Sequence, residues 1–225
     1  MSAKLSKREL EGPDFFQSSI EKISDYISEN KTRFYVIVTA TIAAIVIAFG
    51  IYLYWNNYQT SAIELYVKAQ ERISADQSPE SVQESVKMFK ELVEKYPGSR
   101  SAQMARYHLG NIYYVIGDLD NAISIYKDFV SSAHSDNSSV KFLVLTSLGY
   151  CFETKRDIKG ALGYFEEAQK ISSPGFEAIG YRNIARIYEQ LNDKKKALEN
   201  YEKALLMTTD HSMIIFIKRK ISSLG

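Results

Sequence analysis

The longest apolar run in the chain, Phe34 to Trp55, constrains everything around it. It reads FYVIVTATIAAIVIAFGIYLYW, and no charged residue occurs between Arg33 and Glu64. An α-helix rises about 1.5 Å per residue, so roughly twenty residues cross a hydrocarbon core about 30 Å thick. Aromatic residues stand at both ends of the run, where amphipathic rings prefer the membrane interface. The sequence therefore predicts a single transmembrane helix over 34–55.

The residues that flank this run predict whether it is cleaved and how it is oriented in the membrane. Secretory signal peptides have apolar segments of roughly 7–15 residues and an Ala-x-Ala cleavage signal, which is not found after Trp55, so we expect an uncleaved anchor. Lys31 and Arg33 abut the N-terminal end, whereas the first basic residue on the other side is Lys68. The positive-inside rule then places the N-terminus in the cytoplasm and the C-terminal domain outside, in the periplasm of a bacterial inner-membrane protein.

Residues 1–33 form a short cytoplasmic segment of mixed charge. Asp14, after Gly12-Pro13, is suited to cap a short amphipathic helix. The apolar residues at helical spacing are Phe16, Ile20, Ile23 and Ile27. Two alternatives remain open for this helix: it lies on the membrane or frays in water, or it docks on a membrane partner.

Composition argues against several classes of function. The formal net charge is +1, without the basic face of a nucleic-acid-binding protein. Cys151 is the only cysteine, which excludes an intramolecular disulfide, and the three histidines show no metal-ligand spacing. No catalytic motif or phosphate-binding loop occurs. We therefore expect no enzyme, no metal, no cofactor and no small-molecule substrate.

The region after the span, 56–225, repeats a pattern of small and aromatic residues. The first unit contains Leu109, Gly110, Tyr113, Ala122, Tyr126 and Phe129; the second contains Leu148, Gly149, Phe152, Ala161, Phe165 and Ala168; the third contains Ile184, Ala185, Tyr188, Ala197, Tyr201 and Ala204. Turn signals fall between the helices of each unit. We expect helical hairpins at about 58–97, 103–133, 141–172 and 177–209, and a capping helix with a polar outer face at 212–224.

Small residues allow two helices to approach closely within a hairpin, and large aromatics fill the space between one hairpin and the next. Because no unit buries its apolar face alone, the units stack into a solenoid. This pattern resembles the tetratricopeptide repeat. The fold predicted is therefore all-α: one N-terminal transmembrane helix followed by a tetratricopeptide-repeat-like solenoid with a C-terminal cap.

The first helix of each hairpin in such a solenoid lines a concave surface. Tyrosine and arginine supply much of the binding energy in protein interfaces, and a groove that contains them suits an extended or helical peptide. The alternative is that the tyrosines only pack between repeats. The residues predicted to face the groove are Tyr107, Asn111, Tyr114, Thr146, Tyr150, Arg182 and Arg186.

The layout of the whole chain, including its ending IKRKISSL, resembles the bacterial YfgM family, an ancillary subunit of the SecYEG translocon. The resemblance implies a periplasmic scaffold that links the Sec translocon to periplasmic chaperones or exported chains. The alternative is a structural or assembly subunit of a cell-envelope or secretion complex.

Overall fold

All the regular structure in the described part of the chain is helical. The computed structural model describes residues 15–132, 138–171 and 174–225, in which ten α-helices follow one another without a strand. The chain divides into two compact units, Met1–Asn57 and Tyr58–Gly225. The prediction of an all-α fold is confirmed.

The first unit contains a short helix and most of a very long one. Helix α1 spans Phe15–Glu29, and α2 spans Lys31–Ala75, 45 residues without a break. The apolar part of α2 is exposed, and the helix is long and apolar enough to cross a membrane. In α1, Ile20 and Ile23 are exposed. Asp14 and the side chain of Phe16, assigned above to this helix, lie outside the described residues.

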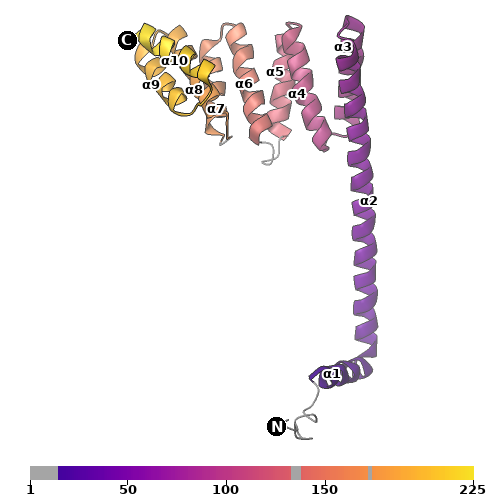
Figure 1. The fold of residues 1–225 in the computed structure, drawn as a ribbon. Helices are drawn as coiled ribbons and strands as arrows, with labels where there is room; N and C mark the ends of the chain where they lie inside the picture. Colours follow the sequence, from indigo (N-terminus) through magenta and orange to yellow (C-terminus); the bar gives the residue numbers. More distant parts are fainter. Residues whose placement is uncertain (1–14, 133–137, 172–173) are drawn as a thin grey trace, which may run out of the picture. The chain divides into compact units, whose positions relative to one another are not determined.

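The second unit is a series of antiparallel hairpins followed by one more helix, and Figure 1 shows α4 to α10 side by side. The C-terminal part of α2 is followed by α3. The helices that come next are paired as α4 with α5, α6 with α7 and α8 with α9. Their bounds are α3 Pro79–Lys95, α4 Arg100–Val115, α5 Leu119–Ser132, α6 Ser138–Thr154, α7 Ile158–Lys170, α8 Glu177–Gln190, α9 Lys194–Leu206 and α10 His211–Leu224.

The three turns inside the later hairpins share one local design. Each contains a residue in the left-handed region: Gly117 at φ 81°, Arg156 at φ 66° and Asn192 at φ 60°. An aspartate follows each of them and accepts a hydrogen bond from the backbone N–H three residues later, as an N-cap does. The left-handed residue stops the first helix, and the aspartate starts the second.

Within each hairpin, an aromatic side chain of the second helix lies on a small residue of the first. The ring of Tyr126 contacts Gly110, and an added Cβ at Gly149 would lie 2.6–2.8 Å from ring carbons of Phe165. Tyr201 shares a buried cluster with Ala185 in the third hairpin. These aromatics therefore fill space inside the hairpins, whereas the sequence pattern led us to place them between hairpins.

Contacts between successive hairpins also repeat. The Lys90 ammonium of α3 lies 5.7 Å from the ring centroid of Tyr113 in α4, and Lys127 of α5 lies 5.7 Å from that of Phe152 in α6. At the third equivalent place, the Tyr188 hydroxyl of α8 donates to Glu166 Oε1 of α7 at 3.2 Å. A cation on a ring is thus replaced by a hydroxyl–carboxylate hydrogen bond.

A cluster of hydrogen-bonded polar side chains lies where α2 contacts α4. The Gln70 amide donates to Tyr66 Oη at 2.9 Å and lies 2.8 Å from His108 Nε2, while Tyr66 Oη lies 2.9 Å from the same nitrogen. The His108 ring also stacks on Phe89, with 5.8 Å between the centroids. Burial lowers the pKa of His108. A neutral imidazole whose Nε2 accepts from the amide fits this arrangement.

The cap, α10, covers the last hairpin through Ile217, which is fully buried against Tyr201 and Ala204. Its outer face is less polar than we expected, because Ile215 and Phe216 are 47% and 41% exposed. The expectation of a polar outer face is therefore wrong in the first half of this helix.

Candidate protein-binding groove

A small hollow, here called the aromatic notch, lies between α4, α5 and α6. Its volume is about 140 Å³, close to the cavity of about 150 Å³ that holds a benzene-sized group in another protein. The lining residues are neutral: Asn111, Tyr114, Val115, Tyr126, Ser147 and Tyr150. The notch therefore matches an apolar or aromatic side chain in size and in charge.

Hydrogen bonding fixes the floor of the notch and leaves its edge apolar. The Tyr126 hydroxyl donates to Asn111 Oδ1 at 2.6 Å, and burial raises the pKa of Tyr126, so the phenol stays neutral. At the edge, Val115 is 82% exposed and Tyr114 is 37% exposed. An apolar group that enters the notch would cover both side chains, which burial favours.

A second set of groups, here called the polar seam, joins α6 to α8: Thr146, Tyr150, Glu153, Asn183 and Arg186. The Tyr150 hydroxyl donates to Asn183 Oδ1 at 3.1 Å. The Arg186 guanidinium pairs with Glu153 and lies 5.6 Å from the ring centroid of Tyr150. Tyr150 belongs to both the notch and the seam, so the two are continuous.

Buried polar atoms without a hydrogen-bond partner gather at this junction. In the described part of the chain they are Thr146 Oγ1, Asn183 Nδ2, Arg186 Nη2 and Gln169 Oε1. Three of the four belong to the seam, and the fourth lies on α7, which also packs against α8. An unpaired buried polar group costs about 1–3 kcal/mol, so the α6–α8 junction is less well satisfied than the rest of the solenoid.

The seven residues predicted to face the groove divide into three groups. Asn111, Tyr114 and Tyr150 meet in the notch. Arg186 and Arg182, whose Nη2 donates to Asn183 Oδ1 at 3.3 Å, join the seam. The remaining two are less available. Thr146, which belongs to the seam, is 7% exposed, and Tyr107 is partly buried against the main apolar cluster.

Some residues of these sites were missed by the sequence analysis. Glu153 lies one turn after Tyr150 on α6, and the Gln190 amide on α8 donates to Glu153 Oε1 at 2.5 Å. The helical spacing of Glu153 from Tyr150 and of Gln190 from Arg186 was the signal that could have found them. Val115 and Asn183 have the same helical spacing from Asn111 and Arg186, but their roles also depend on how the hairpins are stacked.

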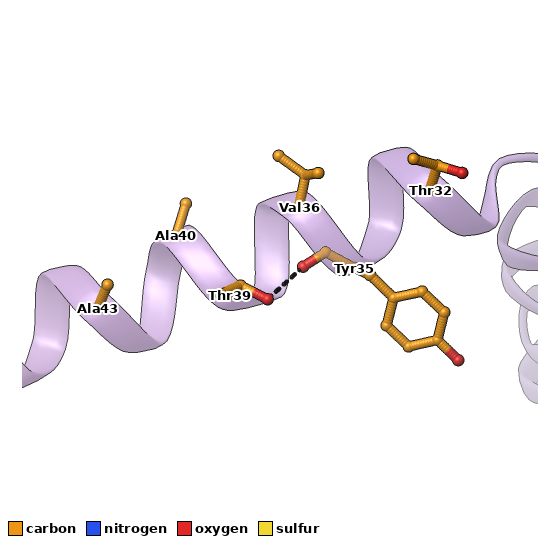
Figure 2. A pocket seen from close by; sticks show the side chains of 6 residues that line it. All are labelled: Thr32, Tyr35, Val36, Thr39, Ala40 and Ala43. Carbon is orange, nitrogen blue, oxygen red and sulfur yellow. Dashed lines mark hydrogen bonds between the residues drawn. The ribbon is translucent and has the colours of Figure 1, made fainter.

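The hollow on α2 and the buried Cys151 do not suggest a catalytic site among the described residues. A shallow hollow of about 570 Å³ follows one face of α2, and Figure 2 shows its six side chains and the hydrogen bond from Thr39 to the Tyr35 carbonyl, 2.7 Å long. Cys151 is fully buried, and burial raises its pKa to about 11. Among the described residues, no group of three or more His, Cys, Asp or Glu is arranged to hold a metal ion.

Comparison with known proteins gives the family. The model of the tetratricopeptide repeat-like domain matches residues 31–225. The chain belongs to this family. The repeats predicted from the small and aromatic residues are thereby confirmed, and the match includes all of α2. No curated protein matches the chain.

Solved structures show the same fold at low identity. A MamA protein is similar with a TM-score of 0.56 and 18% identity, covering 75% of this chain and 81% of its own. A putative kinesin light chain of Podosopora anserina, with nearly identical tetratricopeptide-like repeats, has a TM-score of 0.55 and 14% identity, covering 74% and 86%. Repeat domains of this family generally bind proteins, and most are scaffolds rather than enzymes.

Proposed function

We propose that this protein is a membrane-anchored scaffold whose aromatic notch receives an apolar side chain of a partner protein. One observation carries the proposal: the notch is a neutral hollow of about 140 Å³ on the first-helix face, with Val115 82% exposed at its edge. Large apolar groups at the surface of a repeat domain are typical of protein-binding sites. The partner is an extended or helical segment of another protein.

We further propose that residues 34–55 of α2 form a single membrane span and that the repeats work in the periplasm. The length and apolar composition of α2 support the span. The basic flank of Lys31 and Arg33, with no basic residue on the other side before Lys68, supports a cytoplasmic N-terminus. The chain layout that resembles the YfgM family supports partners at the Sec translocon, periplasmic chaperones or exported chains.

The test is site-specific photo-crosslinking in intact membranes. A benzophenone amino acid at Val115 reports on the notch, and one at Gly163, which is exposed on α7 with open space around it, is the matched control. We expect adducts at Val115 that identify translocon subunits and soluble chaperones, and none of these adducts at Gly163. Tyr114→Ala should reduce the adducts, because it removes one wall of the notch.

Two results would decide against this function. If Val115 captures one stoichiometric cell-envelope complex and no translocon subunit or chaperone, the protein is a fixed assembly subunit of that complex. If Val115 and Gly163 give the same adducts, the notch is not the binding site. For the topology, a C-terminal alkaline phosphatase fusion should be active, because the enzyme folds only outside the cytoplasm; an inactive fusion excludes the periplasmic placement.

A further inference from the structure

Two basic runs that are distant in sequence meet at one end of the last hairpin. Lys194, Lys195 and Lys196 begin α9, and Lys218, Arg219 and Lys220 lie in the second half of α10. Their contacts reach neighbouring residues of α8. The Lys196 ammonium lies 5.1 Å from the ring centroid of Tyr188, and Lys220 Nζ lies 2.9 Å from Glu189 Oε2. We call these six cations the basic corner.

Two carboxylates beside the basic corner, Glu189 and Asp193, are already engaged. Glu189 accepts from Lys220 and from the Tyr201 hydroxyl. Asp193 caps α9 by accepting from the Lys196 backbone N–H at 3.1 Å. Lys194, Lys195, Lys218 and Arg219 are exposed, and none of them forms an ion pair within the described part of the chain. The formal net charge of the whole chain is only +1, so this excess is local.

The position of the three lysines opposes the stability of the helix that carries them. The N-terminus of a helix has a partial positive charge, which favours acidic residues and disfavours cations. The equivalent first turn of α5 carries Asp120, which pairs with Lys155 at 2.5 Å. The first turn of α9 carries no acidic residue. Asp193 at the N-cap compensates Lys196, whose ammonium lies 3.5 Å from Asp193 Oδ2, but Lys194 and Lys195 have no such partner among the described residues. A cation that lacks a compensating contact inside the fold points to a binding role.

We propose that the basic corner binds an acidic polypeptide segment. The charge is complementary, and two helices present it. A membrane surface is the competing occupant, because proteins that lie on lipid insert large apolar side chains beside their cations. Ile215 and Phe216 of α10 are exposed one turn before Arg219, but no large apolar side chain is exposed beside Lys194 and Lys195 in the first turn of α9. Repeat domains of this family generally bind proteins, which also favours the polypeptide.

The test uses the full chain in phosphatidylcholine nanodiscs and a fluorescein-labelled decaglutamate peptide, with decaglutamine as the neutral probe. We expect salt-sensitive binding of decaglutamate alone. The variant Lys194→Glu/Lys195→Glu/Arg219→Glu should bind about tenfold more weakly. The control variant Lys68→Glu/Lys87→Glu/Lys159→Glu changes three other exposed lysines and should retain the affinity.

Stability measurements separate loss of binding from loss of folding. Glutamate at the start of α9 favours the helix dipole, so the corner variant should unfold at an equal or higher temperature than the wild type. The neutral variant Lys194→Gln/Lys195→Gln/Arg219→Gln should show an intermediate affinity. Equal peptide affinity in the corner and control variants overturns the proposal. So does a corner variant that loses only its binding to added phosphatidylglycerol vesicles.

Discussion

Two junctions between successive hairpins occupy equivalent places in the solenoid but are built differently. The first lies between α5 and α6, and the second lies between the α6–α7 hairpin and α8. At the first, Phe129 and Phe142 belong to one apolar cluster that extends from α2 to α7. At the second, the buried apolar cluster is smaller, and the polar seam adjoins it. Its fully or nearly fully buried members are Ala161, Phe165, Ile184 and Ile187, and partly buried residues such as Leu162 and Tyr188 pack against them. The buried polar atoms without a partner belong to this second junction.

This difference shows that one repeat pattern produces interfaces of unequal strength. Apolar contacts tolerate small displacements, whereas a buried polar group that loses or lacks its partner is destabilising. In a solenoid, stability is approximately a sum over repeats and their interfaces, so the weaker junction opens first. We therefore expect α8 to α10 to open as a unit before α2 to α7.

The largest effect is expected from removing a core aromatic at the first junction. Phe129→Ala should lower the free energy of unfolding by about 3–5 kcal/mol, because it leaves a cavity in the continuous cluster. Ile187→Ala at the second junction should lower it by about 2–4 kcal/mol. Urea unfolding gives both values. Hydrogen exchange should rise across α3 to α7 for the first variant and mainly in α8 to α10 for the second; identical exchange patterns would remove the distinction between the junctions.

A change inside the hairpin beside the seam tests close packing. Gly149→Ala places a methyl group 2.6–2.8 Å from ring carbons of Phe165, and we expect a loss of about 1–3 kcal/mol. Gly163→Ala on α7 is the control, because nothing lies within 4 Å of its added Cβ. That control should gain up to about 1 kcal/mol, since alanine favours helix. Thermal unfolding of both variants checks the sign.

An effect of the opposite sign is expected in the seam itself. The Thr146 hydroxyl has no partner, so Thr146→Val removes an unpaired polar atom and should stabilise the protein by about 1 kcal/mol. The matched control is Ser85→Ala, because the buried Ser85 hydroxyl donates to the Ala69 carbonyl at 2.9 Å. That substitution should destabilise by about 1 kcal/mol. Loss of stability in Thr146→Val would mean that the hydroxyl is satisfied in solution.

The smallest effect concerns the polar cluster of Tyr66, Gln70 and His108. These side chains are hydrogen-bonded to one another, whereas the seam contains buried polar atoms without a partner. Burial lowers the pKa of His108, so the unfolded chain binds this proton at a higher pH than the folded chain does. The contribution of His108 to stability is complete above the unfolded pKa of about 6.5 and is lost as the pH falls toward the lowered folded pKa. Urea unfolding between about pH 7.5 and pH 5 measures this slope.

Two variants isolate the contribution of His108 to that slope. The groups that face its ring are Tyr66 and Gln70 from α2, Phe89 from α3 and Tyr107 from α4 itself. None of them is an acidic or basic side chain. His108→Gln should flatten the dependence on pH, whereas His211→Gln, at an exposed position, should leave it unchanged. An unchanged slope in His108→Gln contradicts the assignment.

Much of the fold could be predicted from local sequence signals. Gly110 and Gly149, and the aspartates after the turns, have roles that depend only on neighbours within one hairpin. The direction in which Tyr126 points was not predictable in this way, because repetition alone does not tell whether a ring fills space inside a hairpin or between two hairpins. The exposed Phe216 of α10 was missed for a similar reason, since helical spacing does not show how wide the covered face is.

The candidate site was harder to predict than the fold. Helical periodicity identified Asn111, Tyr114 and Tyr150, which share the notch, but it did not show that Thr146 is nearly buried. The burial of a groove residue depends on the angle between hairpins. That angle is set by packing across the whole interface, as between Phe142 and Phe176, whose ring centroids are 5.0 Å apart. No short motif specifies such an angle.

The contacts of Lys90, Lys127 and Glu166 with the next hairpin have a consequence for the order of the repeats. In each case a charged side chain of one hairpin's second helix contacts an aromatic residue in the first helix of the next hairpin. The ammonium groups lie over the rings of Tyr113 and Phe152, and the carboxylate accepts from the hydroxyl of Tyr188. A chain in which the α6–α7 hairpin was duplicated in tandem would place Glu166 against a second Phe152, which has no hydroxyl to donate. The repeats are therefore not interchangeable modules, because each hairpin's contact residue suits the hairpin that follows it in the chain.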